Sequence, residues 1–115
     1  LSENNAEKLG LYIINEQINV SSSLNLKKKE GIYLSDSGPK VSAAIYGFWR
    51  WEEGNDITSA NIERVVNLCL ELGINTFDHA DYYGNNQLEE QFGRIIEQKS
   101  FKREDIVLFS KCNNP

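Results

Sequence analysis

The sequence predicts an α/β fold in which parallel strands alternate with amphipathic helices. Apolar runs typical of strands alternate with two segments of helical periodicity. The runs also recur regularly, because Ile45, Phe77 and Phe109 take comparable strand positions about 32 residues apart. Roughly 30 residues per unit fits an eight-unit β/α barrel at least as well as an open doubly wound sheet. Three strands cannot close a barrel, so residues alone leave both architectures open.

Composition limits the classes of protein to consider. The 115 residues suffice for one domain, and 40% hydrophobic with 25% charged residues is typical of a soluble globular protein. The formal net charge of −5 disfavours nucleic acid and anionic lipid as partners. Without an apolar run of ~20 residues or a signal peptide, we expect a cytoplasmic protein. Because the chain starts at Leu1 and has no methionine, we expect a fragment of a longer reading frame.

The two cysteines predict no special chemistry. Cys69 and Cys112 lie in apolar surroundings and show no CxxC or Cys/His ligand spacing. We therefore expect two buried free thiols, no disulfide and no metal site.

Two regions differ in character along the chain. Residues 1–30 are polar, with a serine triplet and a run of lysines at 27–29, which predicts a flexible extension without a function of its own. Residues 31–115 carry the β/α pattern. Strong turn formers at 36–39 separate two β-prone runs, which predicts a hairpin that continues into the first strand of the repeat.

Two helices and two further strands follow. Residues 57–73 predict a helix that Thr58 or Ser59 caps and Gly73 ends. Its apolar face is Ile62, Val65, Val66, Cys69 and Leu72. Residues 74–80 predict a strand, and residues 85–98 a helix that begins with Asn86 and Glu89 as a capping pair. The inward residues of this helix are Leu88, Phe92, Ile95 and Ile96. Residues 105–112 predict a strand covered on both faces.

Reactive side chains gather where these strands end. The sequence GFWRW follows the first strand, Asp78 and Tyr83 come at and after the end of the second, and Lys111 ends the third. Parallel sheets and β/α barrels bind ligands at this edge. An ammonium there requires a partner carboxylate, and Asp78 is the natural one. A cation close to Tyr83 would lower the pKa of the phenol and make it a usable acid. A purely structural ion pair, with Tyr83 capping the next helix, is equally compatible with these residues.

Linked motifs resemble the aldo-keto reductases over about residues 31–112. NTFDHADYYG resembles the family signature, QLEEQFGRII the glutamate-pair and glycine segment that follows it, and IVLFSKC the strand that ends in lysine. GPKVSAAIYGFWRW resembles the N-terminal hairpin and first strand. The DHAD form of the signature and the tryptophan pair look most like a bacterial subgroup of uncertain substrate.

The resemblance implies a (β/α)8 TIM barrel that reduces aldehydes or ketones with a nicotinamide cofactor, commonly NADPH. This chain would supply the N-terminal hairpin, about three strands and two helices. Tyr83 would be the general acid, tuned by Lys111 and Asp78. Gly47, Phe48 and Trp49, with Asp78, match the residues beside the nicotinamide. Trp49 and Tyr82 would form walls of the substrate pocket.

The resemblance is incomplete at two points. The family's catalytic histidine lies on the strand after the lysine strand, beyond residue 115, and His79 does not replace it because it faces away from Asp78. The loops that bind the cofactor phosphates also belong to the C-terminal half of the barrel. We expect the 115 residues alone to be inactive, and either to associate with themselves or to require the missing half.

Three other interpretations remain open from the sequence. A lysine at a strand end also serves Schiff-base lyases. A cofactor-binding regulatory subunit can share the same fold. An inactive truncated product is the third.

Overall fold

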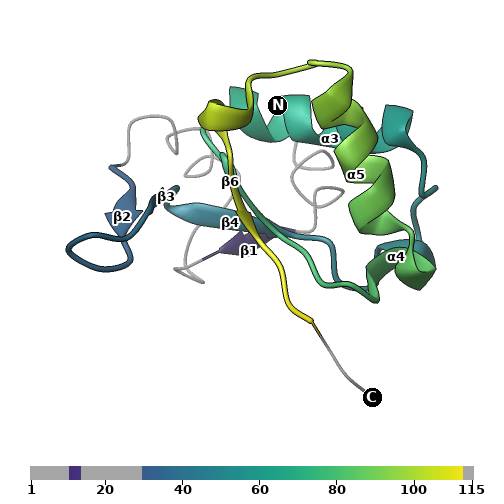
Figure 1. Ribbon diagram of the computed structural model, residues 1–115, viewed down its shortest axis with the longest axis horizontal. Helices are drawn as coiled ribbons and strands as arrows, with labels where there is room; N and C mark the ends of the chain where they lie inside the picture. The colour runs from purple at the N-terminus through teal and green to yellow at the C-terminus, as the bar shows by residue number, and fades with distance from the viewer. Residues whose placement is uncertain (1–10, 14–29, 113–115) are drawn as a thin grey trace.

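The computed structural model describes residues 11–13 and 30–112 as a four-stranded sheet and a separate hairpin, with the two longer helices on one face of the sheet (Figure 1). The order of strands in the sheet is β1-β4-β5-β6. Strands β4, β5 and β6 are parallel, and β1 pairs antiparallel with β4. These strands are β1 (Leu11–Ile13), β4 (Ala44–Gly47), β5 (Thr76–Asp78) and β6 (Val107–Phe109). The predicted β-α-β-α-β order is confirmed.

The N-terminal part confirms one prediction and corrects another. Strands β2 (Ile32–Tyr33) and β3 (Lys40–Val41) form the predicted hairpin, and the Gly38 N–H donates to the Ser35 carbonyl oxygen in its turn. The sequence does not predict strand β1, because the polar composition of residues 1–30 indicates a flexible extension. A short apolar patch was enough to add an edge strand to β4. Residues 1–10 and 14–29 lie outside the described part, where that prediction is not tested.

Helix α3 (Ser59–Glu71) forms as the sequence predicts. The Thr58 hydroxyl caps it by accepting from the backbone N–H of Asn61, and Gly73 follows its end with φ of 83°. All five predicted inward residues of this helix region are buried: Ile62, Val65, Val66, Cys69 and Leu72.

The second helical region starts differently from the prediction. A single turn, α4 (Tyr83–Asn86), precedes helix α5 (Leu88–Glu97), and Gln87 occupies the N-cap of α5 without a side-chain hydrogen bond. The expected capping pair of Asn86 and Glu89 is therefore wrong. Asn86 has a positive φ of 66°, which places it in the turn, and the Glu89 carboxylate bonds to Ser110 instead.

The register of the strands corrects the spacing predicted from the sequence. Tyr46 pairs with Phe77, and Phe77 with Leu108, so paired residues are 31 positions apart. Phe109 pairs with Asp78 and does not share the level of Phe77. A shift of one residue exchanges the two faces of a strand, so Phe109 lies on the face opposite to that of Phe77.

Aromatic rings fill the layer between the sheet and the helices. Tyr46, Phe48 and Phe77 are at most 1% exposed. Phe92 of α5 contacts both Phe48 and Phe77, with ring centroids 6.0 and 5.9 Å apart. The Trp51 indole N–H, in the short 3-10 turn η2 (Trp51–Glu53), donates to the Tyr46 hydroxyl at 2.8 Å. This cluster holds β4, β5 and α5 in fixed relation.

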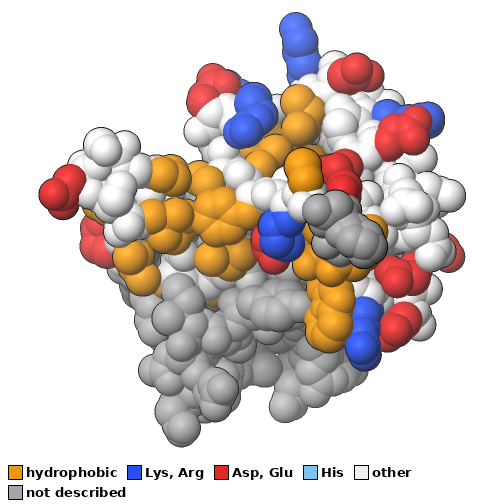
Figure 2. Space-filling view, turned by 60° about the horizontal axis from the view of Figure 1, so that its bottom comes forward, with side chains coloured by type: hydrophobic (Ala, Val, Ile, Leu, Met, Phe, Trp, Pro, Cys, Tyr) orange, Lys and Arg blue, Asp and Glu red, His pale blue; other side chains and the backbone are white. Residues whose placement is uncertain are grey.

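The face of the sheet opposite the helices is only partly covered by described residues. All three residues of β6 are only half-buried, against the prediction of a strand covered on both faces. Hydrophobic side chains gather over the hairpin and the sheet on the face seen in Figure 2, and Ile32, Tyr33 and Leu34 of the hairpin region are 47–65% exposed. The described strands form an open sheet and no closed barrel.

The prediction of two buried free thiols is confirmed for Cys69 and wrong for Cys112. Cys69 is buried and free, and burial raises the pKa of its thiol. Cys112 is also free but exposed, because it follows the end of β6 and no described element covers it.

None of the helices in the described ranges is long and apolar enough to span a bilayer.

Candidate active site

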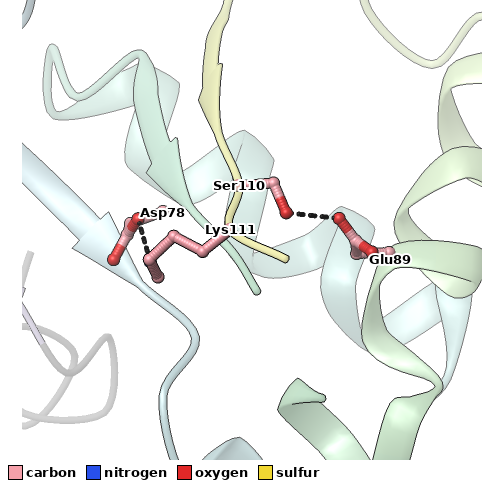
Figure 3. A network of polar contacts seen from close by, with 4 residues as sticks. All are labelled: Asp78, Glu89, Ser110 and Lys111. Atoms are coloured by element: carbon pink, nitrogen blue, oxygen red, sulfur yellow. Dashed lines mark hydrogen bonds and ion pairs between the residues drawn. The ribbon is translucent and has the colours of Figure 1, made fainter. Parts of the chain in front are cut away.

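An ion pair joins the carboxyl ends of β5 and β6. The Lys111 ammonium donates to Asp78 Oδ1 at 2.7 Å (Figure 3), as the sequence predicted. The Asp78 side chain is 32% exposed and that of Lys111 49%, so the pair faces open space at the strand ends. Partial burial lowers the pKa of Lys111, but Asp78 and Tyr83 together raise it above its ordinary value. Lys111 therefore carries a positive charge throughout the neutral range.

Tyr83 belongs to the same group of residues. The Lys111 ammonium lies 5.2 Å from the centroid of its ring, and the side chain is only 7% exposed. Burial raises the pKa of the Tyr83 phenol, Lys111 lowers it and Asp78 raises it again, with a net upward shift. The predicted net decrease of this pKa is thus wrong in the described chain, although the effect of Lys111 has the predicted sign. Tyr83 remains a protonated donor at neutral pH.

The turn after Ala80 fixes the direction of Tyr83. The Tyr83 N–H donates to the Ala80 carbonyl oxygen, and Gly84 adopts a left-handed φ of 62°. A Cβ at Gly84 would lie 2.8 Å from Ile57 Cδ1 and 3.1 Å from Leu88 Cβ. Glycine suits this tight, left-handed passage from the tyrosine into α5, because a side chain there would be strained and would crowd Leu88.

Backbone bonds hold the three strand ends together. The Phe48 N–H donates to the Asp78 carbonyl oxygen, and the Asp81 N–H to the Lys111 carbonyl oxygen. Gly47 pairs with Asp78 in the register of the sheet. The segments that carry the candidate residues are thus fixed to one another independently of side-chain contacts.

The predicted cofactor and pocket residues divide into two groups. Trp49 and Tyr82 are 49% and 45% exposed, and the Tyr82 ring packs edge-on against Tyr83 at 4.9 Å. The Arg50 guanidinium covers the Trp49 ring at 4.3 Å. Phe48, in contrast, is 0% exposed and lies in the aromatic core, because strand alternation turns it away from Gly47 and toward the helices. Its side chain does not line the site, which corrects that prediction.

His79 lies in the core, as the alternation of strand side chains predicted. Its ring stacks on Phe48 at 4.8 Å and meets Phe92 edge-on at 4.5 Å. It is 3% exposed, and neither ring nitrogen has a hydrogen-bond partner among the described residues. Burial, with a smaller contribution from the charge of Lys111, lowers the pKa of His79 to about 4.

This buried histidine predicts a loss of stability in acid. A group whose pKa falls on folding stabilises the protein fully above its unfolded pKa and loses that contribution as the pH falls toward the folded value. Between pH 6.5 and 4, the free energy of unfolding should decrease by up to about 3 kcal/mol through His79. Urea unfolding at several pH values measures it. The matched variant His79→Phe should lack this component, and an equal acid dependence in both proteins would contradict the assignment.

Sequence reasoning missed one contact at this site. Ser110 Oγ donates to Glu89 Oε2 at 2.5 Å, from the end of β6 to the first turn of α5 (Figure 3). The signal was available in part, because Ser110 precedes Lys111 and must point to the opposite side of the strand. Its partner could not be identified before the start of α5 was known. No trio of His, Cys, Asp or Glu suited to a metal occurs in the described ranges 11–13 and 30–112.

Known proteins match the stretch that builds this site. The sequence model described as "Aldo/keto reductase family" matches residues 44–115, which contain Asp78, Tyr83 and Lys111. The chain belongs to the aldo/keto reductase family. It is 39% identical over 73 residues to the uncharacterized oxidoreductase YcsN of Bacillus subtilis, covering 64% of this chain and 24% of that protein. It is 33% identical over 81 residues to the oxidoreductase YdhF of Escherichia coli, covering 70% and 27%.

A relative of another kind matches the same region. The probable voltage-gated potassium channel subunit beta of Arabidopsis thaliana is 35% identical over 78 residues, which cover 68% of this chain and 24% of that protein. The aligned part is thus about a quarter of the length of each of these relatives. The family membership accounts for the three parallel strands with helices on one face, which agree with part of a β/α barrel.

Proposed function

We propose that the protein containing this chain is an NADPH-dependent oxidoreductase that reduces aldehydes or ketones to alcohols. The observation that carries the proposal is the contact of Lys111 with Asp78 at 2.7 Å and with the Tyr83 ring at 5.2 Å. Family membership and relatives named as oxidoreductases support it. The complete protein would be a closed (β/α)8 barrel, of which residues 31–115 are the N-terminal portion.

In this proposal, Tyr83 is the general acid. Its protonated phenol donates to the carbonyl oxygen of the substrate as negative charge develops there. The Lys111 ammonium stabilises the phenolate that remains, and Asp78 holds the ammonium in place. Tyr82, which packs against Tyr83, and Trp49, which follows the end of β4, expose aromatic surface and would suit an aromatic or apolar carbonyl substrate.

The residues at the strand ends also fit a nicotinamide cofactor. The Asp78 carboxylate is partly exposed and can accept hydrogen bonds from a ribose hydroxyl or an amide, and the exposed face of Trp49 can pack on a planar ring. Gly47 stands beside Asp78 in the register. These three residues would contact the cofactor, which supplies the hydride when bound. The choice of NADPH over NADH follows the commoner use in the family.

A regulatory subunit is the second candidate. The similarity to a probable potassium channel subunit beta favours it, because the same Asp78, Tyr83 and Lys111 group could serve cofactor binding without physiologically important turnover. Turnover separates the two candidates.

In the test, the whole protein is mixed with NADPH and an activated aromatic aldehyde such as 4-nitrobenzaldehyde, and the absorbance of NADPH is followed. We expect aldehyde-dependent oxidation of NADPH with one alcohol formed per NADPH. Binding of NADPH without turnover would support the regulatory subunit instead. The isolated 115 residues should neither bind NADPH tightly nor reduce the aldehyde, since the open edge of β6 leaves backbone groups unpaired in the described sheet. A micromolar affinity of the isolated 115 residues for NADPH, measured by calorimetric titration, would contradict this expectation.

A further inference from the structure

The side chains at the end of β6 point in two opposite directions. Lys111 reaches toward Asp78 of β5, whereas Ser110 points to the other side, toward Glu89 of α5 (Figure 3). The two residues are adjacent in sequence, so any movement of Ser110 also moves Lys111. Within the described ranges, the backbone bonds of this segment run to the segment that follows β5, where the N–H groups of His79 and Asp81 donate to the carbonyl oxygens of Phe109 and Lys111.

The bond between Ser110 and Glu89 therefore attaches the strand end to a different layer. A hydroxyl that donates to a carboxylate makes one of the stronger kinds of hydrogen bond, because the acceptor is charged. Glu89 also lies in the first turn of α5, where the helix dipole favours a negative charge. The same helix is anchored in the core by Leu88 and Phe92, which are 0% and 2% exposed. Glu89 is thus an exposed acceptor whose backbone belongs to a helix anchored in the core.

We propose that Ser110 and Glu89 are positioning residues that set the place of the Lys111 ammonium relative to Asp78 and Tyr83. The inference rests on the proposed function for its kinetic consequence, but its structural content concerns Lys111 alone. Without this bond, the end of β6 loses its side-chain tie to α5, and the long lysine side chain samples positions farther from both partners. The charge that stabilises the Tyr83 phenolate then acts for only part of the time.

The kinetic test uses the whole protein with Ser110→Ala and Glu89→Gln. Each variant should lower kcat roughly tenfold with little change in KM, because misplacement of a catalytic group affects the transition state most. The basic limb of the pH profile of kcat/KM should move to higher pH, because Lys111 lowers the pKa of Tyr83. The double variant should be no worse than either single variant, since both remove the same bond.

Two control variants distinguish positioning from general damage. Ser110→Thr keeps the hydroxyl and should retain both kcat and the pH profile. Glu90→Gln removes the same charge one residue away, where Glu90 pairs with exposed Arg94 at 3.3 Å, and should leave both unchanged. Wild-type kcat and an unshifted basic limb in Ser110→Ala would overturn the inference. Equal losses in Glu90→Gln would overturn it as well.

A readout without turnover separates this inference from the proposed function. Nuclear magnetic resonance of ¹³C-labelled lysine, assigned with Lys111→Arg, gives the pKa of Lys111 in the whole protein. Ser110→Ala should lower that pKa, because Asp78 raises it only while the pair is formed. An unchanged pKa would reject the positioning role even in an active enzyme. A lowered pKa in a protein without carbonyl reduction would support the positioning role and reject the proposed function.

Discussion

Replacement of Tyr83 by phenylalanine should lower kcat for carbonyl reduction by about 10²- to 10⁴-fold, the usual contribution of a positioned general acid. The ring of Tyr83 is 7% exposed and packs against Tyr82 and under the Lys111 ammonium. Phenylalanine keeps that packing and removes only the proton. The dissociation constant for NADPH should therefore change little, and steady-state kinetics with a binding titration measure both quantities.

Tyr82→Phe is the matched control. It removes a phenol from the neighbouring position, where the side chain is 45% exposed, and should retain kcat within a few-fold. A Tyr83→Phe protein with wild-type kcat would exclude Tyr83 as the acid. Equal losses in both variants would assign the effect to the shape of the pocket.

Truncation of Phe77 to alanine should destabilise the protein by about 3 to 5 kcal/mol without a direct effect on chemistry. Phe77 is 0% exposed, and its ring lies 5.9 to 6.5 Å from those of Tyr46, Phe48 and Phe92. Removal of the ring leaves a cavity between the sheet and α5. Asp78, the next residue, faces the opposite side and keeps its bond to Lys111.

Denaturant unfolding and kinetics together test this placement. The contrasting variant is Trp49→Ala, which removes a half-exposed aromatic ring at the candidate site. It should change KM for aromatic aldehydes and leave the free energy of unfolding nearly unchanged. A Phe77→Ala protein that is as stable as the wild type and has lost only turnover would show that Phe77 faces the site.

The sequence predicted those elements that depend on local patterns. Helix α3 has a capping hydroxyl at Thr58, a regular apolar face and a terminal glycine, so each local preference favours the same structure. The hairpin likewise depends on a short turn. The pairing of Asp78 with Lys111 followed from strand order and from the cost of an unpaired ammonium, two arguments that need no coordinates.

The errors arose where distant parts of the chain decide the structure. Equal spacing of strands suggested that Phe109 shares the level of Phe77, but register depends on how the connecting helices pack and differs by one residue. Glu89 was assigned to a local cap, yet its partner is 21 residues away at the end of another strand. The neighbouring charge alone predicts a lowered pKa for Tyr83, whereas burial raises that pKa by more than Lys111 lowers it.

Transfer of deuterium tests the central claim most directly. The whole protein is incubated with an aromatic aldehyde and NADPH that carries deuterium on the transferred position of the nicotinamide, and the alcohol is analysed by mass spectrometry. The account predicts an alcohol one mass unit heavier at the former carbonyl carbon, formed by the wild type and largely lost in Tyr83→Phe. Tight binding of NADPH with unchanged aldehyde and no labelled alcohol would contradict it.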